Sequence, residues 1–353
     1  MHTLITGGAG FIGSHLAEYL ISQGDDVTVL DNLSTGRLAN LRQLSRDPRL
    51  GFVEGDVRDT ELVESLIAQA DRVFHLAAAV GVHVILDDPL GSLRTNLHGT
   101  ENVLASANRH ETRVLLASTS EIYGKNTADR LHENSDRILG SPLLSRWTYA
   151  AAKGIDEAFA HAYWRKHDLQ VSIVRLFNTV GPRQTGRYGM VVPRLVRQAL
   201  NDEPLTVYGD GEQTRCFSYV GDVVPALVAV EEHPDSAGRA FNLGGAQEIS
   251  IKALAEQIID VTGSRSIIEH IPYDQAYGEG YEDMRRRVPD NTAANELVGF
   301  VPKTSVRRII ELVAQAMLRD QTDRAGGLGS TPEGAGATAE VTHRTLAAEG
   351  SAS

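Results

Sequence analysis

The chain has 353 residues, 46 of them acidic and 34 basic, and a net charge of −12 at pH 7. Nucleic acid and anionic membranes select basic surfaces, so we expect neither as a partner. The single cysteine, Cys216, excludes an internal disulfide bond and a cysteine-based zinc site, and we expect no metal. No signal peptide or bilayer-spanning stretch is recognisable, which predicts a soluble, cytoplasmic protein.

Short runs of Val, Ile and Leu alternate with helix-length segments through the first half of the chain. Such alternation predicts right-handed βαβ units and a parallel sheet that helices cover on both faces. The fold class is therefore α/β, with a Rossmann-type, doubly wound parallel sheet. The expected strands are 2–6, 27–30, 51–53, 73–76, 114–118 and 171–176, and the expected helices include 11–23, 60–69 and 100–109.

The second half of the chain follows a different pattern. The regular alternation ends after Phe177, and helices mix with short, isolated strands. We expect residues 1–178 to form the first domain and residues 179–320 mainly a smaller, mixed α/β lobe, with one strand at 240–243 returning to the sheet. Residues 321–353 have almost no bulky side chains, which predicts a disordered tail.

A glycine-rich loop follows the first strand and opens the first helix. Gly7, Gly10 and Gly13 permit a tight turn, close approach of a pyrophosphate and close packing of helix on strand. Glycine triplets also arise by chance in flexible loops, but the order strand, loop, helix is the context that dinucleotide binding requires. Asp31 ends the second strand, where it can accept hydrogen bonds from a ribose and repel a 2′-phosphate, which favours NAD over NADP.

Hydroxyl, acid and amine groups occur in two later segments. The strand at 114–118 leads into Thr119, Ser120 and Glu121, whereas Tyr149 and Lys153 are four residues apart on one helix face. A lysine ammonium and an oxidised nicotinamide nearby would lower the pKa of a phenol, which is ordinarily about 10. Tyr149 could then take a proton from a sugar hydroxyl as hydride leaves carbon, with Thr119 sharing the hydrogen bond. Such a pair is usually structural, and it indicates catalysis here only together with the cofactor loop.

These motifs resemble the extended short-chain dehydrogenase/reductase family of nucleotide-sugar epimerases, dehydratases and decarboxylases. The resemblance covers about residues 1–318 and includes the segments 95–100 and 177–178. It implies a tightly held NAD that is reduced and reoxidised within one turnover. The implied cofactor contacts are Gly7, Gly10, Phe11, Ile12, Gly13, Asp31, Asn32, Ser34, Thr35, Gly36, Asp56, Val57, Leu76, Ala77, Ala78, Asn96, Ser118, Tyr149 and Lys153.

The resemblance also implies a nucleoside diphosphate site in the second half. Asn178 and Arg215 would contact phosphates, Tyr208 would lie against the uracil, and Arg287 would hold a carboxylate, with Arg187 in reserve. Arginine suits both groups because its planar fork donates two parallel hydrogen bonds. A solvated basic patch is the alternative explanation for arginines at 285–287.

The residues after the catalytic strand separate the subfamilies. Sugar 4,6-dehydratases carry Asp where this chain has Ser120, and simple 4-epimerases usually lack the acid at Glu121. UDP-glucuronate decarboxylases carry this Ser-Glu pair, so the resemblance implies C4 oxidation, loss of CO2 and formation of UDP-xylose or its 4-keto precursor. The predicted catalytic residues are Thr119, Ser120, Glu121, Tyr149, Lys153 and Arg287.

Two other functions stay open. A UDP-glucuronate or UDP-glucose 4-epimerase would differ only in the fate of the keto sugar. A catalytically silent NAD-binding protein would have no need of Tyr149 and Lys153, which argues against it.

We also expect a homodimer. Apolar residues on two helices could form a four-helix contact between copies, or could equally face the core. They are Val103, Leu104 and Ala107 on the first helix, and Ile155, Phe159 and Ala162 on the second.

Overall fold

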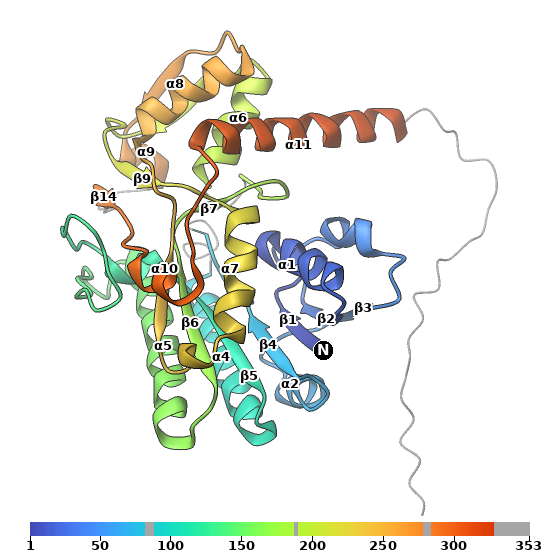
Figure 1. The fold of residues 1–353 in the computed structure, drawn as a ribbon. Coiled ribbons are helices and arrows are strands. Elements are labelled where there is room, and N and C mark those ends of the chain that lie inside the picture. The colour runs from blue at the N-terminus through green and yellow to red at the C-terminus, as the bar shows by residue number, and fades with distance from the viewer. Residues whose placement is uncertain (82–87, 187–189, 278–283, 328–353) are drawn as a thin grey trace, which may run out of the picture. The chain divides into compact units, whose positions relative to one another are not determined.

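The computed structural model describes residues 1–81, 88–186, 190–277 and 284–327, and within them a seven-stranded, fully parallel sheet forms the centre (Figure 1). Its order is β11-β6-β5-β4-β1-β2-β3, so the chain winds outward in both directions from β1 and β4. The predicted α/β fold class is confirmed. The strands are β1 (His2–Thr6), β2 (Asp26–Asp31), β3 (Leu50–Glu54), β4 (Arg72–His75), β5 (Arg113–Thr119), β6 (Val171–Leu176) and β11 (Ala240–Leu243).

Helices cover both faces of this sheet. On one face α1 (Phe11–Ser22) and α7 (Val220–Glu232) bury their apolar residues against the strands. The other face is covered by α2 (Thr60–Ile67), α4 (Pro89–His110) and α5 (Thr148–His167). Side chains of the central strands are buried on both faces, so β1 and β4 show no alternation of buried and exposed residues.

Helix α4 begins earlier than the sequence predicts. It starts at Pro89 rather than near Thr100, because Asp88 caps it by accepting a hydrogen bond from the Gly91 N–H at 2.8 Å, and proline suits the first helical position. Val103, Leu104 and Ala107 on this helix are fully buried against the sheet. These three residues therefore face the core and are closed to a partner subunit.

A second core lies among the later elements. The helices α6 (Val191–Leu200), α8 (Ile251–Thr262) and the start of α11 (Val306–Gly327) pack around β8 (Leu205–Tyr208), which pairs with β13 (Ile268–Ile271). Two further small sheets are β12 (Glu248–Ser250) with β9 (Thr214–Cys216) and β14 (Arg286–Arg287), and β7 (Thr179–Val180) with β10 (Ser218–Tyr219). The short helices α9 (Tyr273–Tyr277) and α10 (Thr292–Val298) complete this half.

The carboxyl-terminal segment differs in part from expectation. The chain divides into two units, Met1–Met317 and Leu318–Ser353, and α11 continues to Gly327. Residues 321–327 are thus helical rather than disordered, because no proline and no glycine before Gly326 interrupts the run of helix formers. Residues 328–353 lie outside the described part. The division into a domain at 1–178 and a lobe at 179–320 stays a prediction. No helix in the described ranges is both long and apolar enough to cross a membrane.

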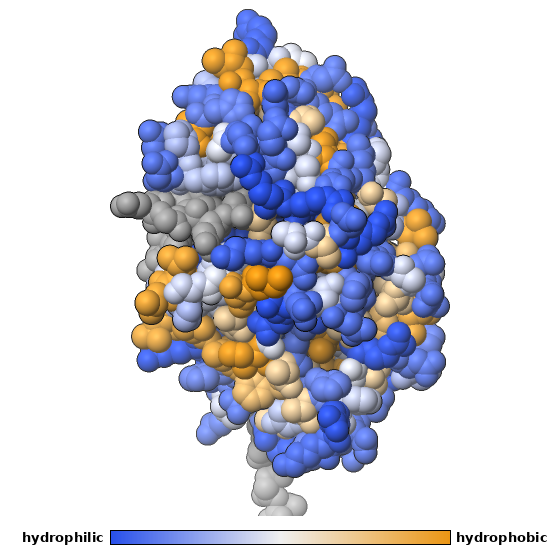
Figure 2. Space-filling model, turned by 90° about the vertical axis from the view of Figure 1, so that its left-hand side faces the viewer, coloured by the Kyte–Doolittle hydropathy of each residue, from blue (hydrophilic) through white to orange (hydrophobic). Residues whose placement is uncertain are grey.

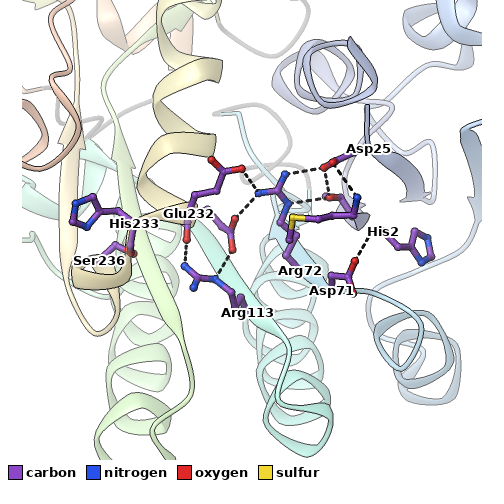
Figure 3. Close-up of polar contacts among 11 residues, drawn as sticks. His2, Asp25, Asp71, Arg72, Arg113, Glu232, His233 and Ser236 are labelled. Atoms are coloured by element: carbon purple, nitrogen blue, oxygen red, sulfur yellow. Dashed lines mark hydrogen bonds and ion pairs between the residues drawn. The ribbon is translucent and has the colours of Figure 1, made fainter. Parts of the chain in front are cut away.

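A buried ionic cluster joins the amino ends of the central strands to the end of α7 (Figure 3). Arg72, only 2% exposed, pairs with Asp25 at 2.8 Å and with Glu231 at 2.8 Å. Arg113 approaches Glu231 at 2.9 Å, and the amino-terminal ammonium lies 3.3 Å from Asp25. The cluster is at the opposite edge of the sheet from the carboxyl ends of the strands.

We expect Arg72→Met to lower the free energy of unfolding by about 3–5 kcal/mol, since two buried carboxylates would lose their shared cation. Urea denaturation measures the change. The control is Arg265→Met, whose ion pair with Asp202 is exposed, and which should leave the urea midpoint unchanged. An Arg72→Met midpoint equal to that of the wild type would contradict a stabilising role.

Candidate active site

A cavity of about 710 Å³ runs along the carboxyl ends of the strands, from the loop after β1 to β14. Ligands of open α/β sheets bind at this edge, beside the point where the strand order reverses. Both halves of the chain contribute to its wall.

The glycine-rich loop forms one end of the cavity. Gly7 has φ +72°, and a Cβ there would lie 2.8 Å from the Ala77 backbone nitrogen, so a side chain does not fit. A Cβ on Gly13 would collide with the Gly7 carbonyl oxygen. No side chain in the described part of the chain caps the start of α1, and the first turn of this helix has no acidic residue. The open N–H groups of this turn, at the positive end of the helix, fit the diphosphate of a dinucleotide.

Asp31 is fixed at the end of β2. Its Oδ2 accepts a hydrogen bond from the Ala9 N–H at 3.0 Å, and its Oδ1 accepts one from the Leu33 N–H at 2.8 Å. Burial raises the pKa of Asp31, while these two hydrogen bonds act in the opposite direction. The carboxylate keeps further lone pairs toward the cavity, as the predicted ribose contact requires.

Most of the predicted cofactor contacts line the cavity, but three do not: Gly36, Asp56 and Asn96. Asn96 instead accepts a hydrogen bond from the Ala79 N–H at 2.9 Å and so holds the segment after β4. The Arg58 guanidinium holds the pKa of Asp56 at about 2 through a hydrogen-bonded pair at 2.7 Å. The contacts that do line it are Gly7, Gly10, Phe11, Ile12, Gly13, Asp31, Asn32, Ser34, Thr35, Val57, Leu76, Ala77, Ala78, Ser118, Tyr149 and Lys153.

The predicted catalytic residues all lie on the cavity wall: Thr119, Ser120, Glu121, Tyr149, Lys153 and Arg287. The Thr119 side chain acts to lower the pKa of Tyr149. Burial raises the pKa of Tyr149 above its usual range, and the charges of Glu121 and Asp156 raise it further. In the protein alone, Tyr149 therefore does not ionise more easily than an ordinary phenol. The expected help from Lys153 is offset because its Nζ lies 3.1 Å from the Asp156 carboxylate.

Glu121 bridges two arginines from distant segments. It lies in a 3-10 helix, η2 (Ser120–Tyr123), directly after β5. Its Oε2 is 2.6 Å from Arg146 Nη1, and its Oε1 contacts Arg287 Nη1 on β14. Burial alone would raise the pKa of Glu121, but the two guanidinium groups outweigh it and hold the pKa well below its usual range. Two cations against one carboxylate leave one excess positive charge, which suits an anionic ligand group.

The predicted substrate contacts Asn178, Tyr208, Arg215 and Arg287 line the same cavity. The Asn178 amide is already engaged, since it donates to the Cys216 carbonyl oxygen at 3.0 Å and accepts from Arg287 at 2.8 Å. Arg187 lies outside the described residues. The geometry therefore makes Asn178 a bridge between β9 and β14, in addition to any phosphate contact.

Three residues at this site were not assigned from the sequence, and two of them carried a spacing signal. Arg146 lies three residues before Tyr149, in the 3-10 helix η3 (Ser145–Trp147) that leads into α5, and Asp156 lies three residues after Lys153 on α5 itself. Arg194 is a third, with its guanidinium carbon 4.2 Å from the centre of the Tyr208 ring. No spacing rule links these two, because they lie on different elements.

The chain matches the family described as GDP-mannose 4,6 dehydratase over residues 4–313. It belongs to this family. One relative is a UDP-N-acetyl-alpha-D-glucosaminuronate decarboxylase of Bacillus cytotoxicus, which is 41% identical over 86% of this chain and 93% of the relative. UDP-glucuronic acid decarboxylase 1 of Arabidopsis thaliana is 39% identical over 87% of this chain and 67% of the relative.

Solved structures agree on the fold of the family. A UDP-glucose 4-epimerase from Thermotoga maritima with UDP-glucose superimposes with a TM-score of 0.82 at 29% identity, covering 91% of this chain and 100% of that one. A UDP-glucuronic acid 4-epimerase from Bacillus cereus, in complex with UDP-glucuronic acid and NAD, gives 0.82 at 27% identity, covering 90% and 99%. The resemblance to nucleotide-sugar epimerases, dehydratases and decarboxylases is confirmed.

We expect Glu121→Gln to lower the free energy of unfolding by about 1–3 kcal/mol, because both arginines lose a charged acceptor. A carboxylate with a depressed folded-state pKa stabilises fully above its unfolded pKa of about 4.3, and this contribution is lost as the pH falls further. The difference in free energy of unfolding between wild type and Glu121→Gln should thus be constant from about pH 9 to 5. This gap should close in stronger acid.

Urea denaturation across this pH series measures the gap. Glu101→Gln, at an exposed position on α4, is the matched control and should show no such gap. A gap that widens as the pH falls would mean that Glu121 is not held ionised by the arginines.

Proposed function

We propose that this protein is an NAD-dependent UDP-glucuronate decarboxylase, a nucleotide-sugar lyase that yields UDP-xylose or UDP-4-keto-xylose. The observation that carries the proposal is Glu121 held between Arg146 and Arg287 on the same cavity wall as Tyr149 and Thr119. This arrangement offers an excess positive charge for a carboxylate beside an acid–base residue. The names of the decarboxylase relatives support the same reaction.

NAD as the cofactor is supported by the open turn of α1, the glycine cradle and the fixed Asp31 carboxylate. Solved family members are also described as NAD complexes. A bound NAD would supply the hydride acceptor for the sugar C4. The site residues named above are our proposed contacts for it and for the UDP-sugar.

In the redox step, Tyr149 removes the proton of the C4 hydroxyl while Thr119 shares the hydrogen bond. Tyr149 can do this only if positive charge compensates its burial. Lys153, buried at 2% exposure on the same helix face, is the chain's own source of that charge. Return of the proton to O4 completes the cycle when the sugar is reduced again.

Oxidation at C4 makes the uronate a β-keto acid. Its C5–C6 bond breaks, CO2 leaves, and the electron pair moves into the ketone as an enolate, which then takes a proton from solvent water at C5. Arg287 and Arg146 hold the carboxylate by their excess charge. Because the pKa of Glu121 is held well below its usual range, Glu121 orients these cations rather than storing a proton.

The leading alternative is a UDP-uronate 4-epimerase, since the Bacillus cereus structure shares the fold and is described with UDP-glucuronic acid. A second candidate substrate is the 2-acetamido uronate, which the name of the Bacillus cytotoxicus relative contains. A binding protein without catalysis is disfavoured by Tyr149 and Lys153 on the cavity wall.

We also propose a cytoplasmic homodimer, without nucleic acid or membrane as a partner. The surface that includes α5 shows hydrophobic patches among hydrophilic ones in its lower half (Figure 2). On this helix Ile155 is 45% exposed, Ala162 is exposed and Phe159 is half-buried. Phe159 packs against the core, whereas Ile155 and Ala162, unlike the three residues of α4, are open to a second copy.

Purified protein with UDP-glucuronate and NAD should release CO2 and form a UDP-pentose. Tyr149→Phe removes the acid–base hydroxyl but keeps the ring, so both ligands should still bind while turnover falls by about 10²-fold or more. Tyr163→Phe, on the same helix, is the control and should keep wild-type turnover.

The products separate the alternatives. UDP-galacturonate without CO2 would establish the 4-epimerase in place of the decarboxylase. Faster turnover of UDP-N-acetylglucosaminuronate than of UDP-glucuronate would make the 2-acetamido uronate the proposed substrate. Wild-type turnover by Tyr149→Phe would remove Tyr149 from the mechanism.

A further inference from the structure

Helix α5 carries a buried carboxylate to which the proposed reaction assigns no task. Tyr149, Lys153 and Asp156 follow one another at a spacing of four and three residues, so they share one face of the helix. Asp156 is 0% exposed and Lys153 is 2% exposed. The Lys153 Nζ lies 3.1 Å from Asp156 Oδ2.

The charged groups on neighbouring elements have ion-pair partners of their own. On η2, Glu121 is paired with Arg146 and Arg287. On α5 itself, Glu157 is paired with Arg175 of β6 at 2.7 Å. Among the described residues, Asp156 forms an ion pair with Lys153 alone.

A further titratable neighbour, on β4, is His75. Its ring lies between the hydroxyls of Thr6 at 2.7 Å and Thr100 at 3.1 Å. Burial lowers the pKa of His75 to about 3, and the charge of Lys153 acts in the same direction. His75 is therefore neutral at physiological pH and adds no charge to the pair.

Asp156 therefore reduces the net positive charge that Lys153 contributes near Tyr149. With Asp156 ionised, the buried pair is close to neutral, and little net positive charge remains to stabilise a phenolate. Burial raises the pKa of Asp156, against the effects of Lys153 and the Thr100 hydroxyl. An uncharged side chain at this position would leave Lys153 as an unopposed cation.

We propose that Asp156 is a positioning residue that acts through Lys153 and sets the pH at which Tyr149 gives up its proton. The proposal rests on the proposed function in one respect, namely that Tyr149 is the base. It concerns the protein's own residues and does not depend on which UDP-sugar is the substrate.

The test is Asp156→Asn, which keeps the shape of the side chain and removes its charge. Tyr149 ionisation is followed by ultraviolet difference titration of the full-length protein. The reference for wild type is Tyr149→Phe, and the reference for Asp156→Asn is the same protein with Tyr149→Phe added. We expect Tyr149 in the Asp156→Asn protein to ionise at a pH that is lower than in wild type by about one unit or more. This is the size of effect that one nearby charge produces. At a fixed pH this corresponds to about tenfold more phenolate.

The pH profile of kcat/KM for UDP-glucuronate is the second readout, and its acidic limb should move to lower pH by a similar amount. Asp168→Asn, the same exchange at the exposed end of α5, is the control and should move neither readout. Asp156→Glu keeps the charge and should restore the wild-type titration. If Asp156→Asn does not fold, Asp156→Ser is the uncharged variant, with the same expected direction.

The proposal would be overturned if Asp156→Asn changed neither the Tyr149 titration nor the acidic limb of the kcat/KM profile and only lowered kcat or the melting temperature. Asp156 would then be a structural partner of Lys153. A wild type that does not turn over UDP-glucuronate would refute the proposed function instead, and the Tyr149 titration would still decide the role of Asp156.

Discussion

The candidate active site depends on a single carboxylate that joins two guanidinium groups. Glu121 follows β5 of the central sheet, Arg146 precedes α5, and Arg287 lies on β14, more than a hundred residues further along the chain. Without the negative charge between them, the two arginines would repel each other at the base of the cavity. Glu121 therefore fixes the sheet to the later half of the chain at the point where we place the sugar acid.

Around this bridge, the balance of charge differs from one pair to the next. Glu121 has two cations and leaves an excess positive charge, whereas Lys153 and Asp156 cancel each other. An anionic group is thus favoured beside Glu121, and a phenolate at Tyr149 is not favoured by the protein alone. The two requirements of the proposed reaction, holding a carboxylate and ionising a tyrosine, are set by separate ion pairs.

The features that the sequence predicts are local ones. The parallel sheet follows from alternating runs, the dinucleotide loop from three glycines after a strand, and the Tyr149–Lys153 pair from helical spacing. Contacts between distant segments could not be predicted in this way. The bridge from Glu121 to Arg287 depends on how β14 approaches the sheet. Whether Val103 faces the core or a partner likewise depends on how α4 is rotated, which periodicity alone leaves open.

The central claim is that this bridge selects a sugar with a carboxylate at C6. The most direct measurement is calorimetric affinity for UDP-glucuronate and for UDP-glucose, in wild type and in Arg287→Ala. We expect wild type to bind the uronate at least about tenfold more tightly, a difference of about 1.4 kcal/mol, and Arg287→Ala to lose this preference while it keeps its affinity for UDP-glucose. Equal affinities in wild type, or a preference that survives in Arg287→Ala, would contradict the account.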